Sequence, residues 1–181
     1  MKLNFKKKNK GFTLIEILLV VGFIALASVG VYTIYSKVQV SNNANAESRN
    51  IDLIRAGIKS LYASQTNYNA LTPTIVNNAR ITPENMKLTA ATIGNSFGGS
   101  VDIAPIGVNG GANNGFRITY DKVPGPVCTK LASAAAAQFD AVTAGGSAVK
   151  VFGVNSINVA NLTTGCNSDT GAGVTMQFDS L

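Results

Sequence analysis

The sequence predicts an α+β domain in which one long N-terminal helix packs on an antiparallel sheet. Three observations lead to this prediction. Residues 12–35 are apolar with a single charge, aliphatic side chains then recur at helical spacing as far as residue 61, and short alternating segments between Gly- and Asn-rich loops follow. Alternating helix and strand would also suit an α/β unit, but the short final strands argue against it.

The composition argues against an enzyme. Hydrophobic residues make up 46% of the 181 residues and charged residues only 13%, with a mean hydropathy of +0.21, which is unusually apolar for a soluble domain. The absence of His excludes His-dependent nucleophilic catalysis, a His general base and a His-ligated metal. The Gly-rich stretches 94–99 and 107–115 fit no phosphate-binding motif. We therefore expect a binding, assembly or structural protein without a cofactor or metal.

The net charge of +6 does not indicate nucleic-acid binding, because the basic residues are concentrated at the N-terminus. Five lysines and no acidic residue lie among the first eleven residues: Lys2, Lys6, Lys7, Lys8 and Lys10. The rest of the chain carries ten basic and nine acidic side chains, without the basic stripe that phosphate contacts require.

Residues 12–35 are long enough to span a membrane as a helix. The helix would be about 36 Å long, against about 30 Å for the hydrocarbon core of a bilayer, and Glu16 is its only charged residue. The lysines before it predict a cytoplasmic N-terminus and an exported remainder. A cleaved signal peptide is the alternative, but the small residues from Ala25 to Gly30 offer only a weak cleavage site.

The residues around position 11 resemble the leader of a type IV prepilin. The stretch Lys10-Gly11-Phe12-Thr13-Leu14-Ile15-Glu16 combines basic residues, a Gly at the cut, a Phe as the new N-terminus and a Glu five residues into the mature chain. A Glu inside an uncharged span is costly and rare, which makes the motif specific. The close resemblance covers residues 6–35. The short leader and mature Phe are typical of type IVa pilins, whereas the region after the helix is more similar to type IVb pilins.

The resemblance implies a type IV pilin fold with an αβ-roll, and it implies processing of the N-terminus. Residues 1–11 would be a leader that prepilin peptidase removes between Gly11 and Phe12, after which Phe12 is N-methylated. Residues 12–35 would be the transmembrane and assembly helix. In a bundle of such helices Glu16 would enter a low-dielectric interior, where the Phe12 ammonium of a neighbouring copy is the available opposite charge.

The helix is expected to continue over residues 36–66 as an amphipathic segment. The charged side chains of this segment, Glu47 among them, lie largely away from the apolar stripe, which is expected to pack on the sheet. The stripe consists of Val40, Ala44, Ile51, Ile54, Ile58 and Leu61.

Residues 67–181 are expected to form the globular part. A short helix is predicted to open at Thr82-Pro83-Glu84, and a second helix is predicted over Pro126–Val142, with Val127, Leu131, Ala135, Phe139 and Val142 on one face and Gly145-Gly146 at its end. Strands are expected at Val101–Ile106, Phe116–Val123, Val149–Val154, around Ile157–Val159, and at Gly173–Asp179.

Two cysteines, Cys128 and Cys166, lie on the exported side of the predicted span. The exported compartment permits a disulfide, and two cysteines allow only one intramolecular pairing. A pair of buried free thiols is the alternative. The bridge would bound residues 128–166, which resemble the disulfide-bounded region of type IV pilins.

Three functions are compatible with these sequence features. The first is a structural subunit that polymerises through its apolar helix into an extracellular filament for adhesion, aggregation or conjugation. The second is a minor pilin or a type II secretion pseudopilin, although Asp169 and Asp179 are too sparse for the C-terminal calcium site expected of a major pseudopilin. The third is a membrane-anchored exported binding module.

The first function implies particular partners and places. The expected partners are further copies of the chain in a helical filament, the prepilin peptidase and N-methyltransferase, and the inner-membrane assembly machinery, with the membrane itself as the partner before assembly. The precursor would lie in the bacterial inner membrane, and the mature protein would lie in an extracellular pilus. Nucleic acid is not expected as a main partner.

Overall fold

The computed structural model describes residues 11–167 and 171–181. The chain divides into two units, Met1–Gln39 and Val40–Leu181, which are described separately below. Helix α1, Leu14–Leu61, supplies residues to both units. Among the described residues it is the one helix that is long and apolar enough to cross a membrane, and its most apolar window has a mean hydropathy of 2.6.

Helix α1 begins directly after Thr13 and ends at Leu61. The Thr13 hydroxyl accepts the backbone N–H of Glu16 at 3.3 Å, which satisfies one of the free donors of the first turn. The helix ends before the predicted residue 66. The chain turns after Leu61, and the ring of Tyr62 packs on that of Tyr68 at a centroid distance of 5.3 Å.

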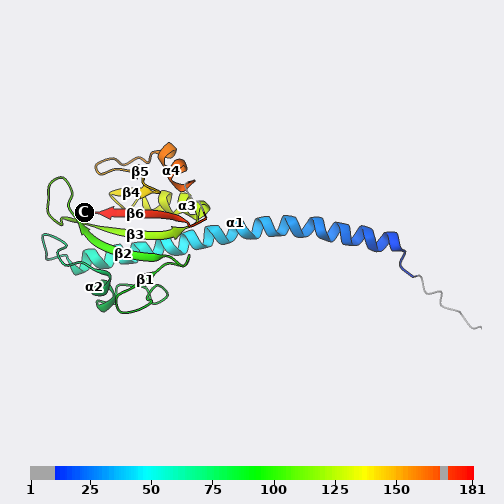
Figure 1. Cartoon of the computed structure of the whole chain (residues 1–181), viewed down its shortest axis with the longest axis horizontal. Coiled ribbons are helices and arrows are strands. Elements are labelled where there is room, and N and C mark those ends of the chain that lie inside the picture. The colour runs from blue at the N-terminus through cyan, green and yellow to red at the C-terminus, as the bar shows by residue number, and fades with distance from the viewer. Residues whose placement is uncertain (1–10, 168–170) are drawn as a thin grey trace, which may run out of the picture. The chain divides into compact units, whose positions relative to one another are not determined.

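The sheet of the second unit contains six strands, and every neighbouring pair is antiparallel. The strand order is β1-β2-β3-β6-β4-β5, so the last strand lies between β3 and β4 (Figure 1). This arrangement confirms the predicted α+β class. The strand bounds are Ile93–Gly94 for β1, Ser100–Ile106 for β2, Gly115–Val123 for β3, Ala141–Ala144 for β4, Ser147–Lys150 for β5 and Val174–Ser180 for β6.

The C-terminal part of α1 belongs to the core of the second unit, as the aliphatic stripe predicted. Ala44, Ile51, Ile54 and Ile58 are buried in one cluster with side chains of the sheet. Each isoleucine buried in this way stabilises the unit by about 1.5–3 kcal/mol. The ends of the stripe are less buried, since Val40 is half-buried and Leu61 is 44% exposed.

The short helix after α1 lies ten residues earlier than predicted. Helix α2 spans Pro73–Asn78, and the Thr72 hydroxyl caps it by accepting the backbone N–H of Ile75 at 3.4 Å. The prediction at Thr82-Pro83-Glu84 was wrong, although both places have a Thr-Pro pair. The segment after Thr82 forms a turn instead, in which the backbone N–H of the buried Met86 donates to the carbonyl of Pro83 at 2.9 Å.

The second predicted helix is shorter than expected, and the strand β4 takes its last residues. Helix α3 spans Gly125–Ala135, whereas Val142 lies in β4 and pairs with Phe178 of β6. Phe139 and Val142 are buried, as the predicted helical face required. The chain at Val142 is nevertheless extended, because it pairs with the neighbouring strand β6. Gly145 and Gly146, with φ of 52° and 80°, form the β4–β5 turn rather than a helix end.

The segment after β4 differs most from the prediction. Strand β5 ends at Lys150, so the predicted strand to Val154 is too long, and no strand forms at Ile157–Val159. Helix α4, Val159–Cys166, follows instead, and the Asn158 side chain caps it by accepting the backbone N–H of Asn161 at 3.1 Å.

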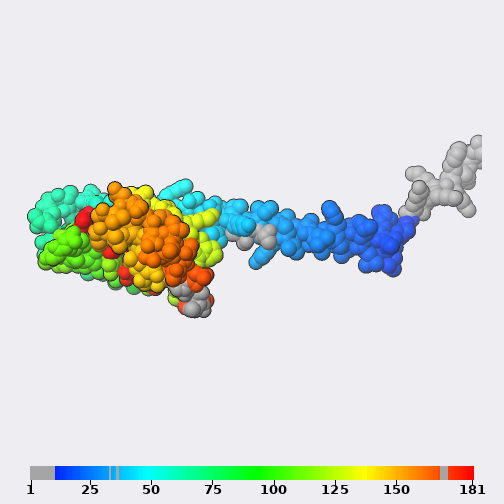
Figure 2. Space-filling view, turned by 90° about the horizontal axis from the view of Figure 1, so that it is seen from above, coloured from blue at the N-terminus to red at the C-terminus, as the bar shows by residue number. Residues whose placement is uncertain are grey.

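Helix α4 and its cap also cover the outer edge of β5. The backbone N–H of Asn158 donates to the carbonyl of Val149 at 2.7 Å, and the Asn161 amide donates to the carbonyl of Ala148 at 2.7 Å. These bonds occupy acceptors that an edge strand would otherwise leave open to a further strand. Figure 2 shows the orange α4 region on one face of the second unit.

Candidate functional site

The predicted processing and assembly residues lie at the start of the first unit. Gly11 and Phe12 precede α1, Phe12 is 79% exposed, and Glu16 lies in the first turn of the helix. The rest of the leader, residues 1–10 with Lys10 among them, lies outside the described residues. Gly11 has open space where a Cβ would lie, so its lack of a side chain serves no contact in this unit.

The apolar stretch that follows is exposed all round the helix. No residue in the most apolar part of the stretch is buried. Large side chains such as Leu19, Leu26 and Val31 are 70%, 77% and 68% exposed. The Ser28 hydroxyl donates to the carbonyl of Ile24 at 2.8 Å and so is satisfied within the helix. A helix that is apolar on all sides requires a bilayer or other apolar helices around it.

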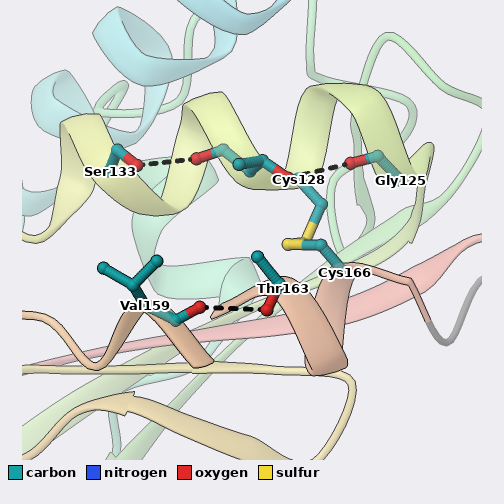
Figure 3. The surroundings of a disulfide bond; sticks show 7 residues. Gly125, Cys128, Ser133, Val159, Thr163 and Cys166 are labelled. Carbon is teal, nitrogen blue, oxygen red and sulfur yellow. Dashed lines mark hydrogen bonds between the residues drawn. A yellow bond between two sulfur atoms is a disulfide. The ribbon is translucent and has the colours of Figure 1, made fainter. Parts of the chain in front are cut away.

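The two cysteines form a disulfide in the second unit. Cys128 lies in α3 and Cys166 is the last residue of α4, with a Cα–Cα distance of 5.6 Å. Figure 3 shows the bond between the two helices, where the Thr163 hydroxyl donates to the carbonyl of Val159 at 3.1 Å. Both cysteines are buried, and the bond between them excludes the alternative of two buried free thiols.

Helix α4 reaches the sheet closely because of Gly165. A Cβ at this position would lie 2.1 Å from the carbonyl oxygen of Ala144 in β4, which is far inside van der Waals contact. The disulfide therefore bridges α3 to a helix that already rests on β4, and residues 128–166 form one packed region.

A buried carboxylate that the sequence reasoning missed connects three segments of the second unit. Glu47 of α1 is fully buried, and its Oε1 accepts the backbone N–H of Ser96 at 2.9 Å and the Ser96 hydroxyl. Its Oε2 accepts the hydroxyl of Tyr120 from β3 at 3.2 Å. Burial, together with the Glu47 charge, raises the pKa of Tyr120 well above its ordinary value of 10.

A signal for this burial was present in the sequence. Positions 44, 47, 51, 54 and 58 follow the three–four alternation of one helical face, so Glu47 lies inside the stripe between Ala44 and Ile51. Its charge led to its assignment to the solvent face. A charged residue at a core position predicts a set of hydrogen-bond donors, which Ser96 and Tyr120 supply.

An ion pair between Arg117 and Asp179 joins the neighbouring strands β3 and β6. Asp179 binds the Arg117 guanidinium through two hydrogen bonds of 2.7 and 2.8 Å, and these raise the pKa of Arg117. Asp169, which with Asp179 was judged too sparse for a calcium site, lies outside the described residues. Within the described ranges, no group of three or more His, Cys, Asp or Glu side chains is placed to hold a metal ion.

An apolar N-terminal helix, an antiparallel sheet packed on the end of that helix and one disulfide define the type IV pilin fold. Two solved structures share it: a type IVb pilin from Salmonella typhi, with a TM-score of 0.60, 21% identity and coverage of 74% of this chain and 97% of that one, and TcpA, a type IV pilin from Vibrio cholerae El Tor, with a TM-score of 0.56, 18% identity and coverage of 77% and 99%.

The sequence comparisons agree with the fold. The family model described as PilS N terminal matches residues 41–178. Two relatives, each the major structural subunit of bundle-forming pilus, from Escherichia coli O111:H- and from Escherichia coli O127:H6 (strain E2348/69 / EPEC), are 30% identical over 168 residues, which cover 92% of this chain and 81% of each relative. The chain therefore belongs to the type IV pilin family, a family of structural subunits rather than enzymes.

Proposed function

We propose that this pilin is the repeating subunit of an extracellular filament that is held together by residues 12–35, and that cleavage between Gly11 and Phe12 precedes assembly. The observation that carries the proposal is the exposed apolar stretch of α1, attached to a folded unit with its own core and disulfide. Before assembly a bilayer can surround this stretch, and in a filament other copies of the same stretch replace the lipid.

Glu16 sets the axial stagger between copies in this proposal. Cleavage before Phe12 leaves a protonated α-amine at the start of an apolar helix. Because an unpaired carboxylate in an apolar interior costs several kcal/mol, arrangements that place Glu16 beside a neighbour's Phe12 amine are favoured over registers that leave either charge alone. The pairing therefore contributes register more than net stability.

The processing steps and the cellular location follow from the same proposal. A prepilin peptidase removes residues 1–11, the same enzyme class methylates Phe12, and inner-membrane machinery adds each subunit to the growing filament. The precursor lies in the bacterial inner membrane with its lysine-rich N-terminus in the cytoplasm, as the charge distribution supports. The mature chain lies in the extracellular pilus.

Lateral association of filaments is the role that we favour among adhesion, aggregation and conjugation. The two relatives that cover most of this chain are subunits of a pilus named for forming bundles. A nearly neutral mature chain supports the same role, because residues 12–181 carry ten basic and nine acidic side chains and hence little net repulsion between filaments.

The decisive experiment replaces Glu16 by Gln in the natural host. Glu16→Gln keeps the size and the hydrogen-bonding capacity of the side chain but removes its charge. We expect normal cleavage, stable membrane-resident pilin and few or no filaments by electron microscopy.

Glu84→Gln is the matched control, because Glu84 is exposed in the second unit. It should leave the filament yield unchanged. A wild-type yield of filaments from correctly cleaved Glu16→Gln protein would remove charge pairing from the mechanism.

A further inference from the structure

The loop between β2 and β3 contains the same reactive dipeptide twice. Asn109-Gly110 lies at its tip, and Asn114-Gly115 lies where it enters β3. An Asn followed by Gly is prone to intramolecular attack, because a glycine nitrogen without a neighbouring side chain can approach the Asn side-chain carbonyl. In both pairs the residue after the Asn is Gly, which sets the intrinsic reactivity, so each pair serves as a reference for the effect of the fold on the other.

The pair Asn109-Gly110 at the tip is exposed, and one hydrogen bond closes its turn. Asn109 and Gly110 are the central residues of a turn closed by one hydrogen bond of 3.0 Å, from the N–H of Gly111 to the carbonyl of Val108. Both have positive φ, 51° and 82°, and a Cβ on Gly110 would meet open space. Among the described residues, none is within hydrogen-bond geometry of the Asn109 amide or the Gly110 nitrogen. Rotation about the Asn109 Cα–C bond is therefore opposed by a single turn bond.

The pair Asn114-Gly115 at the start of β3 is fixed by side-chain hydrogen bonds and strand pairing. The Asn114 side chain accepts the N–H of Val108 at 2.8 Å and donates to the carbonyl of the same residue at 3.1 Å. Gly115 is buried and pairs with Ile106 in the β2–β3 ladder, and a Cβ at Gly115 would lie 2.9 Å from the carbonyl oxygen of Ser180. Attack at Asn114 thus requires both side-chain bonds and the strand entrance to open.

We propose that Asn109-Gly110 is a site of spontaneous deamidation in the folded protein and that Asn114-Gly115 is protected from it. The Gly110 nitrogen forms a bond to Cγ of Asn109, the Cγ–Nδ2 bond breaks, and the proton of the Gly110 nitrogen leaves with the amide as ammonia. Water then opens the resulting succinimide at either carbonyl, giving aspartate or isoaspartate. No oxidant, reductant or enzyme is required.

The modification changes the surface of the unit but leaves its core intact. Either product replaces a neutral amide with a carboxylate, so each modified copy carries one more negative charge at an exposed loop tip. Isoaspartate also adds a methylene to the main chain and disrupts the turn bond between Gly111 and Val108, while the two bonds from Asn114 still hold the base of the loop. Copies of different age would differ in charge at this position.

The test incubates the full chain in detergent micelles in mildly alkaline buffer over days. Tryptic cleavage gives the peptide Leu88–Arg117, and its fragmentation assigns the amide-to-acid mass increase to one Asn or the other. In the folded chain we expect conversion at Asn109 and conversion at least ~30-fold slower at Asn114, because two hydrogen bonds worth about 1 kcal/mol each must open first. After the disulfide is reduced and the chain is unfolded, both sites should convert at similar rates.

Two further measurements sharpen the result. Hydroxylamine traps the succinimide and should cut the folded chain between residues 109 and 110 but not between 114 and 115. Asn109→Gln, whose longer side chain disfavours ring closure, should abolish the modification, whereas Ala112→Gly, a change at an exposed position of the same loop, should leave it in place. Equal rates at the two sites in the folded chain, or an unmodified Asn109 where the unfolded chain converts, would overturn the proposal.

Discussion

The hydroxyl of Tyr120 donates a 3.2 Å hydrogen bond to Oε2 of Glu47, and both side chains are fully buried. The bond connects β3 to α1, and the bonds of Ser96 to the other carboxylate oxygen add the segment before β2. A buried carboxylate is tolerated only when donors replace its lost hydration. Glu47 is therefore a polar centre inside the unit, where a few other polar side chains such as Asn50 and Asn77 are also buried.

Glu47→Gln should destabilise the second unit by about 1–3 kcal/mol, because charge-assisted hydrogen bonds from Ser96 and Tyr120 become neutral ones and an NH2 group replaces one of the two accepting oxygens. Urea unfolding of the full chain in detergent, followed by tyrosine near-ultraviolet circular dichroism, measures the change. Glu84→Gln, the same substitution at an exposed position, should stay within about 0.5 kcal/mol of wild type.

A double-mutant cycle with Tyr120→Phe isolates the pair. The free energies of unfolding should be non-additive by about 0.5–3 kcal/mol, as expected for residues in direct contact. Strictly additive effects would mean that the two side chains are energetically independent despite their contact.

The stability of the second unit should fall at alkaline pH because of Tyr120. Its pKa is raised in the folded state, so above pH of about 10 the unfolded chain loses the phenol proton while the folded chain keeps it, and stability decreases by up to ~1.4 kcal/mol per pH unit. The full contribution is present below the ordinary tyrosine pKa and is lost as the pH rises towards the folded value.

Unfolding free energies measured at a series of pH values above 9 check this expectation. Tyr120→Phe should flatten the alkaline decline, whereas Tyr32→Phe, a change at an exposed tyrosine of the first unit, should leave the slope unchanged. An unaltered slope in Tyr120→Phe would assign the decline to other groups.

Cys128→Ser should destabilise the second unit by about 2–5 kcal/mol, the usual effect of removing a native disulfide from a small exported domain. Insertion of the first unit into the membrane should persist, because that unit contains no cysteine. Urea unfolding and cellular pilin levels measure the loss of stability, and membrane fractionation measures insertion.

Cys166→Ser and the double variant serve as references for this prediction. All three variants should lose similar stability, because each removes the same bond. A Cys128→Ser protein that assembles normally, together with reaction of both wild-type thiols with a thiol reagent before reduction, would contradict the bridge.

Gly11→Val should block removal of the leader, because the peptidase must reach the bond between Gly11 and Phe12 at the membrane surface. Mass spectrometry of membrane-bound protein should then find the uncut chain, whereas wild type should begin at Phe12 and carry an N-methyl group. Gly22→Val is the control, since open space surrounds Gly22 as it does Gly11, and it should be cut normally. Mature wild-type protein that begins beyond Tyr35 would indicate an ordinary signal peptide.

Several features of the protein follow from local patterns that the sequence contains in full. The apolar stretch with its one Glu16, the stripe through Ile51, Ile54 and Ile58, and strands β2, β3 and β6 all depend on residue spacing along a single element. Their predictions hold because hydrophobic burial selects one face of a helix or strand, and that face is visible in the order of residues. The disulfide was predictable because two cysteines allow one pairing.

Other features were decided only when distant segments met. Val142 continues a helical face in the sequence, yet it lies in β4 because it pairs with Phe178 of the last strand, β6. Helix α4 was not predicted and begins at Val159, the last residue of an expected strand; Gly165 lets it approach Ala144, and Asn158 caps it against the edge of β5. Glu47 is buried because Ser96 and Tyr120, from two other segments, supply its donors. In each case the stabilising partner lies far away in the sequence, and spacing within one element carries no information about such a partner.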